Sequence, residues 1–150
     1  MAARSLPVPA CTCGRLRRAA RALTQLYDDV MAPSGLRVTQ FSLLRTLSTQ
    51  GTARMSDLAR TLLLDRTALS RTLDPLAERG FVIVTSGRDA RTREVTLTPA
   101  GVKALREATA HWKRAQSQVV ARIGPAKVDA LIATLSDVEK LHPDPGGVDR

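Results

Sequence analysis

Two cysteines stand near the N-terminus in the run Cys11-Thr12-Cys13, directly before a segment with helical apolar periodicity. The first turns of that predicted helix are crowded with positive charge, carried by Arg15, Arg17, Arg18 and Arg21. A thiol at a helix N-terminus beside guanidinium groups is stabilised as the thiolate, which is the form that reacts with oxidants and soft metals. Cys11 and Cys13 are therefore candidate sensor residues, with two passive thiols on a flexible arm as the competing interpretation.

Three chemistries are open to this pair. A peroxide could oxidise one thiolate to a sulfenic acid, which the other cysteine or a partner subunit then resolves. A soft metal ion or metalloid could bridge Cys11 and Cys13. A disulfide could form directly, although closure across a single intervening residue is tight, which favours a bond between subunits. Two thiolates per chain are too few for a closed zinc site unless subunits share ligands, so we expect no required cofactor.

A second group of polar side chains follows Asp65, which is a good N-cap for a helix starting near Arg66. Leucines at helical spacing predict a buried stripe on this helix, made of Leu69, Leu73 and Leu76. The opposite face presents side chains suited to base edges and phosphates in the major groove of DNA, namely Arg66, Thr67, Ser70 and Arg71. The pattern predicts a recognition helix that ends at Gly80.

An arginine-rich turn follows between two predicted strands, at residues 81–84 and 94–98. An arginine on such a thin wing can enter the narrow minor groove, where the potential is most negative. The candidate DNA-binding residues of the wing are Arg88, Asp89, Arg91 and Arg93. A solvated helix face beside a basic hairpin is the alternative, but the cap, the leucine stripe, the terminal glycine and the wing together favour a winged helix-turn-helix.

Further helices must position this motif. Thr39 and Ser56 are candidate caps for two short helices before the recognition helix, and Thr98-Pro99 begins a long helix that runs to Ile123. A last helix is predicted to about Leu141. The first and last helices carry more apolar surface than a small motif can cover, which favours a two-fold symmetric homodimer.

We therefore predict a mainly α fold with a small β-wing, in which dimerisation helices flank a winged helix-turn-helix. The expected regions are a flexible arm with the cysteine pair (1–13), helical dimerisation segments (14–31 and 99–141), the DNA-binding region (36–98) and a flexible tail (142–150).

The overall charge agrees with a polyanionic partner. The net charge is +9 and the sequence pI is about 10.9, which favours double-stranded DNA. Aromatic residues make up only 3%, which argues against stacking on single-stranded nucleic acid as the main binding mode. No apolar run approaches the ~20 residues of a membrane-spanning helix. The first residues also lack the apolar region of a secretion signal. We expect a cytoplasmic protein with no membrane partner.

Three segments carry a resemblance to a known family: residues 65–71, 76–82 and 89–98, the last with an Asp-x-Arg followed by a Leu-Thr. With them the chain resembles the MarR family of bacterial transcriptional regulators over roughly residues 14–141. The resemblance implies a dimer that binds a palindromic operator, usually as a repressor, and is released by a small molecule or a thiol modification.

The resemblance extends to the organic-hydroperoxide-sensing branch of that family. Cys13, Leu16, Arg21 and Tyr27 follow the spacing of that branch. Its second tyrosine near the thiol is replaced here by Arg17, and the additional Cys11 favours dithiol chemistry over an organic-peroxide pocket.

Two other hypotheses are open. In the first, the cysteines are idle and the dimer responds to an organic anion, such as an aromatic acid, in an interface pocket formed by Arg15, Tyr27, His111 and Trp112; simple packing is the competing interpretation of the last two. In the second, the cysteine pair belongs to a thiol oxidoreductase. The chain has no βαβ pattern and no catalytic base at a recognisable spacing, so we expect a regulator and not an enzyme.

Overall fold

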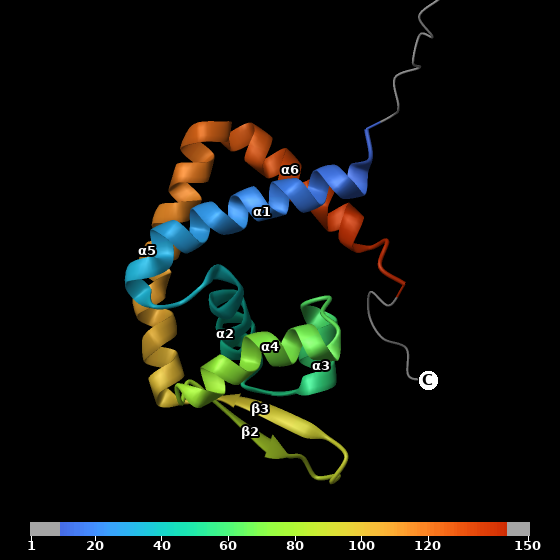
Figure 1. The fold of residues 1–150 in the computed structure, drawn as a ribbon, viewed down its shortest axis with the longest axis vertical. Coiled ribbons are helices and arrows are strands. Elements are labelled where there is room, and N and C mark those ends of the chain that lie inside the picture. The colour runs from blue at the N-terminus through green and yellow to red at the C-terminus, as the bar shows by residue number, and fades with distance from the viewer. Residues whose placement is uncertain (1–9, 144–150) are drawn as a thin grey trace, which may run out of the picture.

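The computed structural model describes residues 10–143. Helices dominate the fold, and a small sheet lies at the end of the molecule opposite to α1 and α6 (Figure 1). In chain order the elements are α1 (Thr12–Met31), the 3-10 turn η1 (Ala32–Ser34), α2 (Val38–Gln50), β1 (Thr52–Arg54), α3 (Met55–Thr61), α4 (Arg66–Glu78), β2 (Val82–Ser86), β3 (Arg93–Leu97), α5 (Pro99–Ile123) and α6 (Pro125–Glu139). The predicted fold class, mainly α with a small β-wing, is confirmed.

The sheet has three antiparallel strands in the order β1-β3-β2. β2 and β3 form the predicted wing, with Val82 paired to Leu97 and Ser86 paired to Arg93. The strand β1 was not predicted from the sequence, because three residues are too few to show an alternating pattern. It is defined by its pairing with β3, which places Ala53 opposite Val95 with both side chains buried.

The core lies where α2, α3, α4 and the sheet meet. The predicted stripe of the recognition helix is confirmed, since Leu69 and Leu76 have no exposed surface and Leu73 has 1%. The stripe packs into one cluster with leucines of the preceding helices, Leu43, Leu44, Leu47 and Leu58. Burial of each leucine side chain contributes about 1.5–3 kcal/mol to the stability of the fold. This cluster therefore fixes the orientation of α4 relative to α2 and α3.

Two of the predicted helix caps are confirmed. Asp65 Oδ1 accepts a hydrogen bond from Ala68 N at 2.7 Å, and Thr98 Oγ1 accepts one from Gly101 N at 3.0 Å. Pro99 occupies the first turn of α5, where its missing N–H costs nothing. These caps fix where α4 and α5 begin.

The other two predicted caps are wrong, because both helices begin one residue before the predicted cap. Thr39 lies inside α2, whose N-cap is Arg37; Gln40 Oε1 accepts from Arg37 N at 3.0 Å. Ser56 lies inside α3, whose N-cap is Arg54 without a side-chain cap. The sequence pattern favoured the hydroxyl residues, but tertiary pairing of β1 with β3 sets the chain direction at Arg54.

The helices α1, α5 and α6 leave apolar surface uncovered. Along α6, only Val128 is buried, whereas Leu131 is 38% exposed and Ile132 is 53% exposed. A cavity of about 540 Å³ lies between α1, α6 and the turn that precedes α4; its apolar lining residues are Leu16, Ala19, Ala20, Leu23, Leu63, Leu131, Leu135, Val138 and Leu141. Within the described residues, no helix is both long and apolar enough to cross a bilayer.

Candidate nucleic-acid interface

The recognition helix α4 presents the predicted face to solvent. Arg66, Thr67 and Arg71 are exposed and Ser70 is partly buried, while the leucine stripe anchors the opposite side. Asp65 caps the helix N-terminus, so the first turn, which carries Arg66 and Thr67, has a defined geometry. This surface combines guanidinium donors with short hydroxyls, the groups that contact base edges and phosphates in the major groove.

The wing is held by its own turn. Asp89 Oδ1 accepts from Arg91 N at 3.2 Å, and the backbone oxygen of Asp89 accepts from Thr92 N at 2.9 Å. Gly87 N donates to Thr92 O at 2.7 Å and closes the loop between β2 and β3. The structure thus gives Asp89 a turn-forming role, whereas Arg88, Arg91 and Arg93 are exposed.

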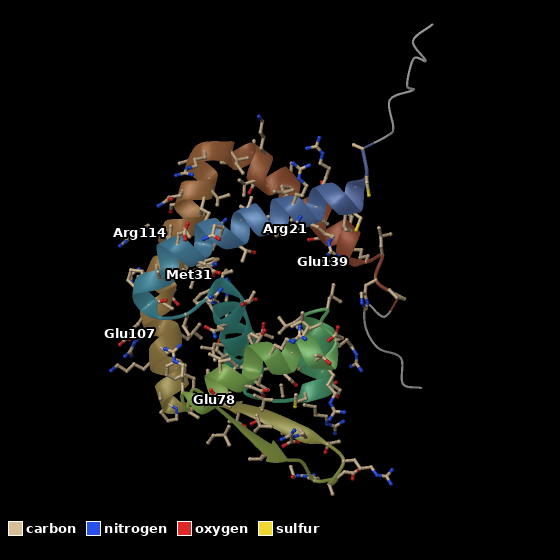
Figure 2. All side chains as sticks on the ribbon, in the orientation of Figure 1. Arg21, Met31, Glu78, Glu107, Arg114 and Glu139 are labelled. Carbon is tan, nitrogen blue, oxygen red and sulfur yellow. The ribbon has the colours of Figure 1, made fainter. Side chains whose placement is uncertain are left out.

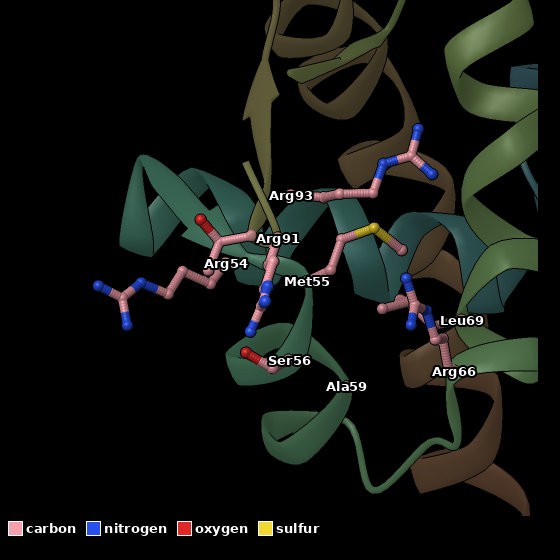
Figure 3. A pocket seen from close by; sticks show the side chains of 9 residues that line it. Arg54, Met55, Ser56, Ala59, Arg66, Leu69, Arg91 and Arg93 are labelled. Atoms are coloured by element: carbon pink, nitrogen blue, oxygen red, sulfur yellow. The ribbon is translucent and has the colours of Figure 1, made fainter. Parts of the chain in front are cut away.

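The wing and the recognition helix meet at a small basic cavity, which we call the arginine pocket. It has a volume of about 240 Å³ and is lined by Arg54, Met55, Ser56, Ala59, Arg66, Leu69, Arg91, Thr92 and Arg93. In Figure 3, Arg54 and Arg91 lie on one side of Met55, and Arg66 and Arg93 lie on the other. The pocket therefore brings together three of the predicted DNA-binding arginines from two separate elements.

Arg54 was not among the DNA-binding residues predicted from the sequence, although it lines the arginine pocket. It lies at the end of β1, which was not predicted, and no helical or alternating pattern marked it. Its neighbour Ser56 was interpreted as a helix cap, but its hydroxyl-bearing side chain lines the same pocket. The unusual feature that could have revealed Arg54 is a basic residue where a helix N-cap normally carries Ser, Thr, Asp or Asn.

The two cysteines lie together at the start of α1. Cys11 is the N-cap residue, and its Sγ accepts a hydrogen bond from Gly14 N at 3.4 Å. Cys13 lies in the first turn, and both thiols are free and exposed. In the described part of the chain, no three His, Cys, Asp or Glu side chains are grouped to hold a metal ion. The predicted sensor residues are thus accessible and adjacent, one of them in direct contact with the helix backbone.

The four residues predicted for an effector pocket are not gathered in one place within this chain. Arg15 and Tyr27 lie on the same helix, twelve positions and thus about 18 Å apart along its axis. The Tyr27 hydroxyl donates to Gln116 Oε1 of α5, and burial raises the pKa of Tyr27 above its usual value. The Tyr27 side chain therefore joins α1 to α5.

Of the two α5 residues of that predicted pocket, Trp112 is packed against the core and His111 is partly buried. Trp112 stacks on Phe41 with ring centroids 5.7 Å apart, and the Arg45 guanidinium lies 4.7 Å from the Trp112 ring centroid. His111 is partly buried, and its Nδ1 has no hydrogen-bond partner among the described residues. These contacts agree with the packing interpretation of Trp112.

Proteins of known structure share this fold over most of the chain. The MarR family profile matches residues 36–92. The structure of the M. tuberculosis transcriptional regulator MOSR in complex with DNA is 39% identical, covers 87% of this chain and 97% of its own, and superposes with a TM-score of 0.76. No curated protein matched the chain.

Two further structures show the same fold with DNA. The transcriptional repressor CouR, bound to a 23-mer DNA duplex, is 26% identical with coverage of 85% of this chain and 92% of its own, and a TM-score of 0.76. A cysteine-to-serine mutant of MarR from E. coli, complexed with operator DNA, is 23% identical with coverage of 83% and 91%, and a TM-score of 0.74. Proteins of this family are dimeric regulators and not enzymes, which confirms that expectation and excludes the thiol oxidoreductase hypothesis. The chain belongs to the MarR family of DNA-binding transcriptional regulators.

Proposed function

We propose that the protein is a dimeric repressor that binds a pseudo-palindromic operator and is released when Cys11 and Cys13 are modified. The observation that carries the DNA-binding part is the arginine pocket, which is lined by Arg66 of α4 together with Arg91 and Arg93 of the wing. Two-fold symmetry would place one α4 in each of two successive major grooves, about 34 Å apart. Because the partner is genomic DNA, we place the regulator in the cytoplasm.

Each residue of the surface has an assigned role in this proposal. Arg66, Thr67, Ser70 and Arg71 contact bases and phosphates from the major groove side, since they share the exposed face of α4. Arg88, Arg91 and Arg93 carry the charge of the wing toward the minor groove. Asp89 contributes by holding the turn that orients those arginines.

The observation that carries the switch is the contact between Cys11 Sγ and Gly14 N at the start of α1. The same helix lines the cavity between α1, α6 and Leu63, and Leu63 belongs to the turn before the recognition helix. Modification of Cys11 or Cys13 would thus act on a helix that adjoins both the dimerisation surface and the DNA-binding turn.

A hydroperoxide would oxidise the two thiols to a disulfide in two steps. The thiolate of one cysteine attacks a hydroperoxide oxygen and becomes a sulfenic acid. The peroxide O–O bond breaks, and its other oxygen leaves as hydroxide or alkoxide and is protonated to water or an alcohol. A second thiol attacks the sulfenic sulfur, which forms a disulfide and releases water. A trivalent metalloid would instead exchange its oxygen ligands for Cys11 and Cys13 thiolates.

Fluorescence anisotropy with the DNA upstream of the protein's own gene tests the proposal. Reduced protein should bind this duplex tightly, and peroxide, diamide or arsenite should release it. Dithiothreitol should restore binding, and a Cys11→Ser, Cys13→Ser double variant should bind but ignore all three reagents. Wild-type binding that is insensitive to all three would remove the cysteine switch and leave the repressor.

A small-molecule response is a second candidate function, favoured by the apolar cavity of about 540 Å³ beside α1 and α6. This cavity lies beside α1 and α6, and neither Tyr27 nor Trp112 is among its lining residues. Calorimetry with aromatic acids on the double serine variant distinguishes the two mechanisms. Ligand binding that releases this variant from its operator would favour the small-molecule response.

A further inference from the structure

The arginine pocket concentrates positive charge in an unusual way. Four arginines, Arg54, Arg66, Arg91 and Arg93, are among the residues that line a cavity of about 240 Å³. The ion pairs formed among the described residues join other partners: Arg37 to Asp28, Arg60 to Asp57, Lys103 to Glu107 and Lys140 to Asp137. The four arginines of the pocket therefore have no ion-pair partner within residues 10–143. Their positive charges repel one another until an anion enters.

The carboxylate groups of Glu94 and Asp65 do not neutralise the pocket. Glu94 is the cross-strand neighbour of Arg54 in the register of β1 and β3, yet the two side chains form no ion pair in the described structure. Asp65 is occupied as the cap of α4 through Ala68 N. The groups that remain available to a ligand are guanidinium donors, the Ser56 and Thr92 side chains and the N-terminal end of α4.

We propose that the arginine pocket binds one phosphate of the DNA backbone, with Arg54 as a phosphate-contacting residue beside the recognition helix and the wing. Guanidinium groups match the oxygens of a phosphate in bidentate geometry and stay charged when desolvated. The pocket lies between the helix that enters the major groove and the wing that reaches the minor groove. The sugar-phosphate backbone that separates these two grooves would pass at this place. The inference rests on the proposed DNA binding and adds a residue and a ligand group to it.

The location of the pocket gives the contact a positioning role. A phosphate contact carries no sequence information, but it fixes the register of the protein on the duplex. Here one phosphate would contact residues of β1, α4 and β3 together, so the angle between wing and recognition helix would be set on the DNA itself. Arg54 should therefore affect all duplexes equally, unlike a base-reading arginine of α4.

The salt dependence of binding tests this assignment. Each phosphate contact contributes about 0.9 to the slope of log K against log salt, so Arg54→Gln should lower the magnitude of the slope by about one and weaken binding about tenfold at ~0.1 M salt. Arg54→Lys keeps the charge and should restore most of the slope. Arg114→Gln, on α5 and away from the wing (Figure 2), is the matched control and should leave the slope unchanged.

Neutral methylphosphonate linkages locate the phosphate. Wild-type protein should lose affinity when one particular linkage of each half-site is neutralised, and Arg54→Gln should be insensitive to that same substitution. Equal losses for wild type and variant at every linkage, or an unchanged salt slope, would overturn the inference while leaving specific DNA binding intact. Absence of specific binding by the wild type would overturn the proposed function and the inference together.

Free phosphate is the other source of the same chemistry. If the pocket served a soluble phosphate, calorimetry without DNA would show saturable binding of inorganic phosphate that Arg54→Gln abolishes. The methylphosphonate scan would then show no linkage at which wild type and variant differ. That pair of results would overturn the assignment to the DNA backbone.

Discussion

At the residue scale, arginines of equal formal charge differ in whether their guanidinium groups are engaged in contacts within the chain or exposed to a ligand. Arg79 follows the recognition helix, but its Nη1 donates to Gly35 O at 2.7 Å and its guanidinium lies 4.5 Å from the centroid of the Phe81 ring. Arg71 is exposed on α4 and makes no hydrogen bond to another described side chain. Tertiary contacts therefore separate an arginine that joins η1 to the end of α4 from one that is free to read DNA.

Arg71 is expected to read a base. Arg71→Ala should weaken binding to the specific operator by about 1–3 kcal/mol and affect an unrelated duplex much less, because one bidentate base contact is lost. Anisotropy titrations on both duplexes measure the difference, with Arg114→Ala as the control for a lost surface charge. Equal weakening on both duplexes would assign Arg71 to a phosphate.

Tyr27 provides a prediction for alkaline pH. Burial raises the pKa of Tyr27 above 10.0, so the neutral phenol, which donates to Gln116, is favoured in the folded state. This contribution to stability is complete below about pH 10 and is lost as the pH rises through the raised pKa. At neutral pH, Tyr27→Phe should reduce the free energy of unfolding by about 0.5–1.5 kcal/mol.

Unfolding in urea from about pH 8 to about pH 11.5 measures this effect, since that range spans the ordinary pKa of tyrosine. The stability difference between wild type and Tyr27→Phe should shrink above about pH 10, because only the wild type loses the phenol contribution. Lysine titration is common to both proteins and cancels in the difference. A constant difference over the whole range would contradict a stabilising role of the neutral phenol.

At the element scale, one glycine fixes how α5 leaves the wing. A Cβ added at Gly101 would clash with Phe81 O and lie 2.7 Å from Leu97 Cδ1, so the first turn of α5 approaches the backbone before β2 more closely than any side chain permits. Thr98 strengthens the same junction through its Oγ1, which donates to Gly80 O at 2.6 Å and also accepts from Gly101 N. The position of the wing relative to α5 depends on this contact.

Glycine-to-alanine changes in two helices should therefore have opposite signs. Gly101→Ala should destabilise the fold by about 2 kcal/mol or more, because Phe81 O is backbone and cannot move freely. Gly14→Ala is the control: its new Cβ would meet Cys11 atoms at an ordinary 3.7 Å, and alanine favours helix by up to about 1 kcal/mol. Thermal unfolding of both variants decides the sign, and a stabilised Gly101→Ala would contradict the close approach.

The cap of the recognition helix gives a second prediction at this scale. Asp65→Ala removes the acceptor for Ala68 N and should cost about 1 kcal/mol of stability. Asp65→Asn keeps an acceptor and should retain most of it. Urea unfolding compares the three proteins; a loss as large for Asn as for Ala would point to the charge of Asp65 instead of its cap.

At the scale of the whole molecule, the uncovered apolar surface of α1 and α6 belongs to a dimeric regulator. We expect the second subunit to cover Ile132, which is 53% exposed in one chain. Ile132→Glu should convert the dimer to a monomer and abolish operator binding, since a single α4 covers only a half-site.

An equally exposed isoleucine supplies the control for this prediction. Ile83 on β2 is 54% exposed, so Ile83→Glu introduces the same charge without touching the dimerisation helices. Sedimentation equilibrium should report a monomer for Ile132→Glu and a dimer for Ile83→Glu. A dimer in both variants would place the interface elsewhere on the molecule.

The sequence by itself determined those features that arise from local periodicity and local capping. The leucine stripe of α4, the Asp65 and Thr98 caps and the alternating strands of the wing each follow from neighbours within a few residues, because helix and strand geometry repeat over that distance. Those signals were sufficient for the fold class and the exposed face of the recognition helix, whereas the family was indicated by the resemblance of residues 65–71, 76–82 and 89–98.

Only the tertiary structure decided which residues from distant segments share a site. The strand β1 exists through pairing with β3, and this pairing carries Arg54 into the arginine pocket beside Arg66, Arg91 and Arg93. Within one chain, Arg15 lies about 18 Å along α1 from Tyr27, and Trp112 packs on Phe41. A pocket that joins Arg15, Tyr27, His111 and Trp112 stays a prediction for the dimer. Contacts between elements depend on the angles and distances that core packing imposes on them. A local sequence pattern determines neither the angles nor the distances.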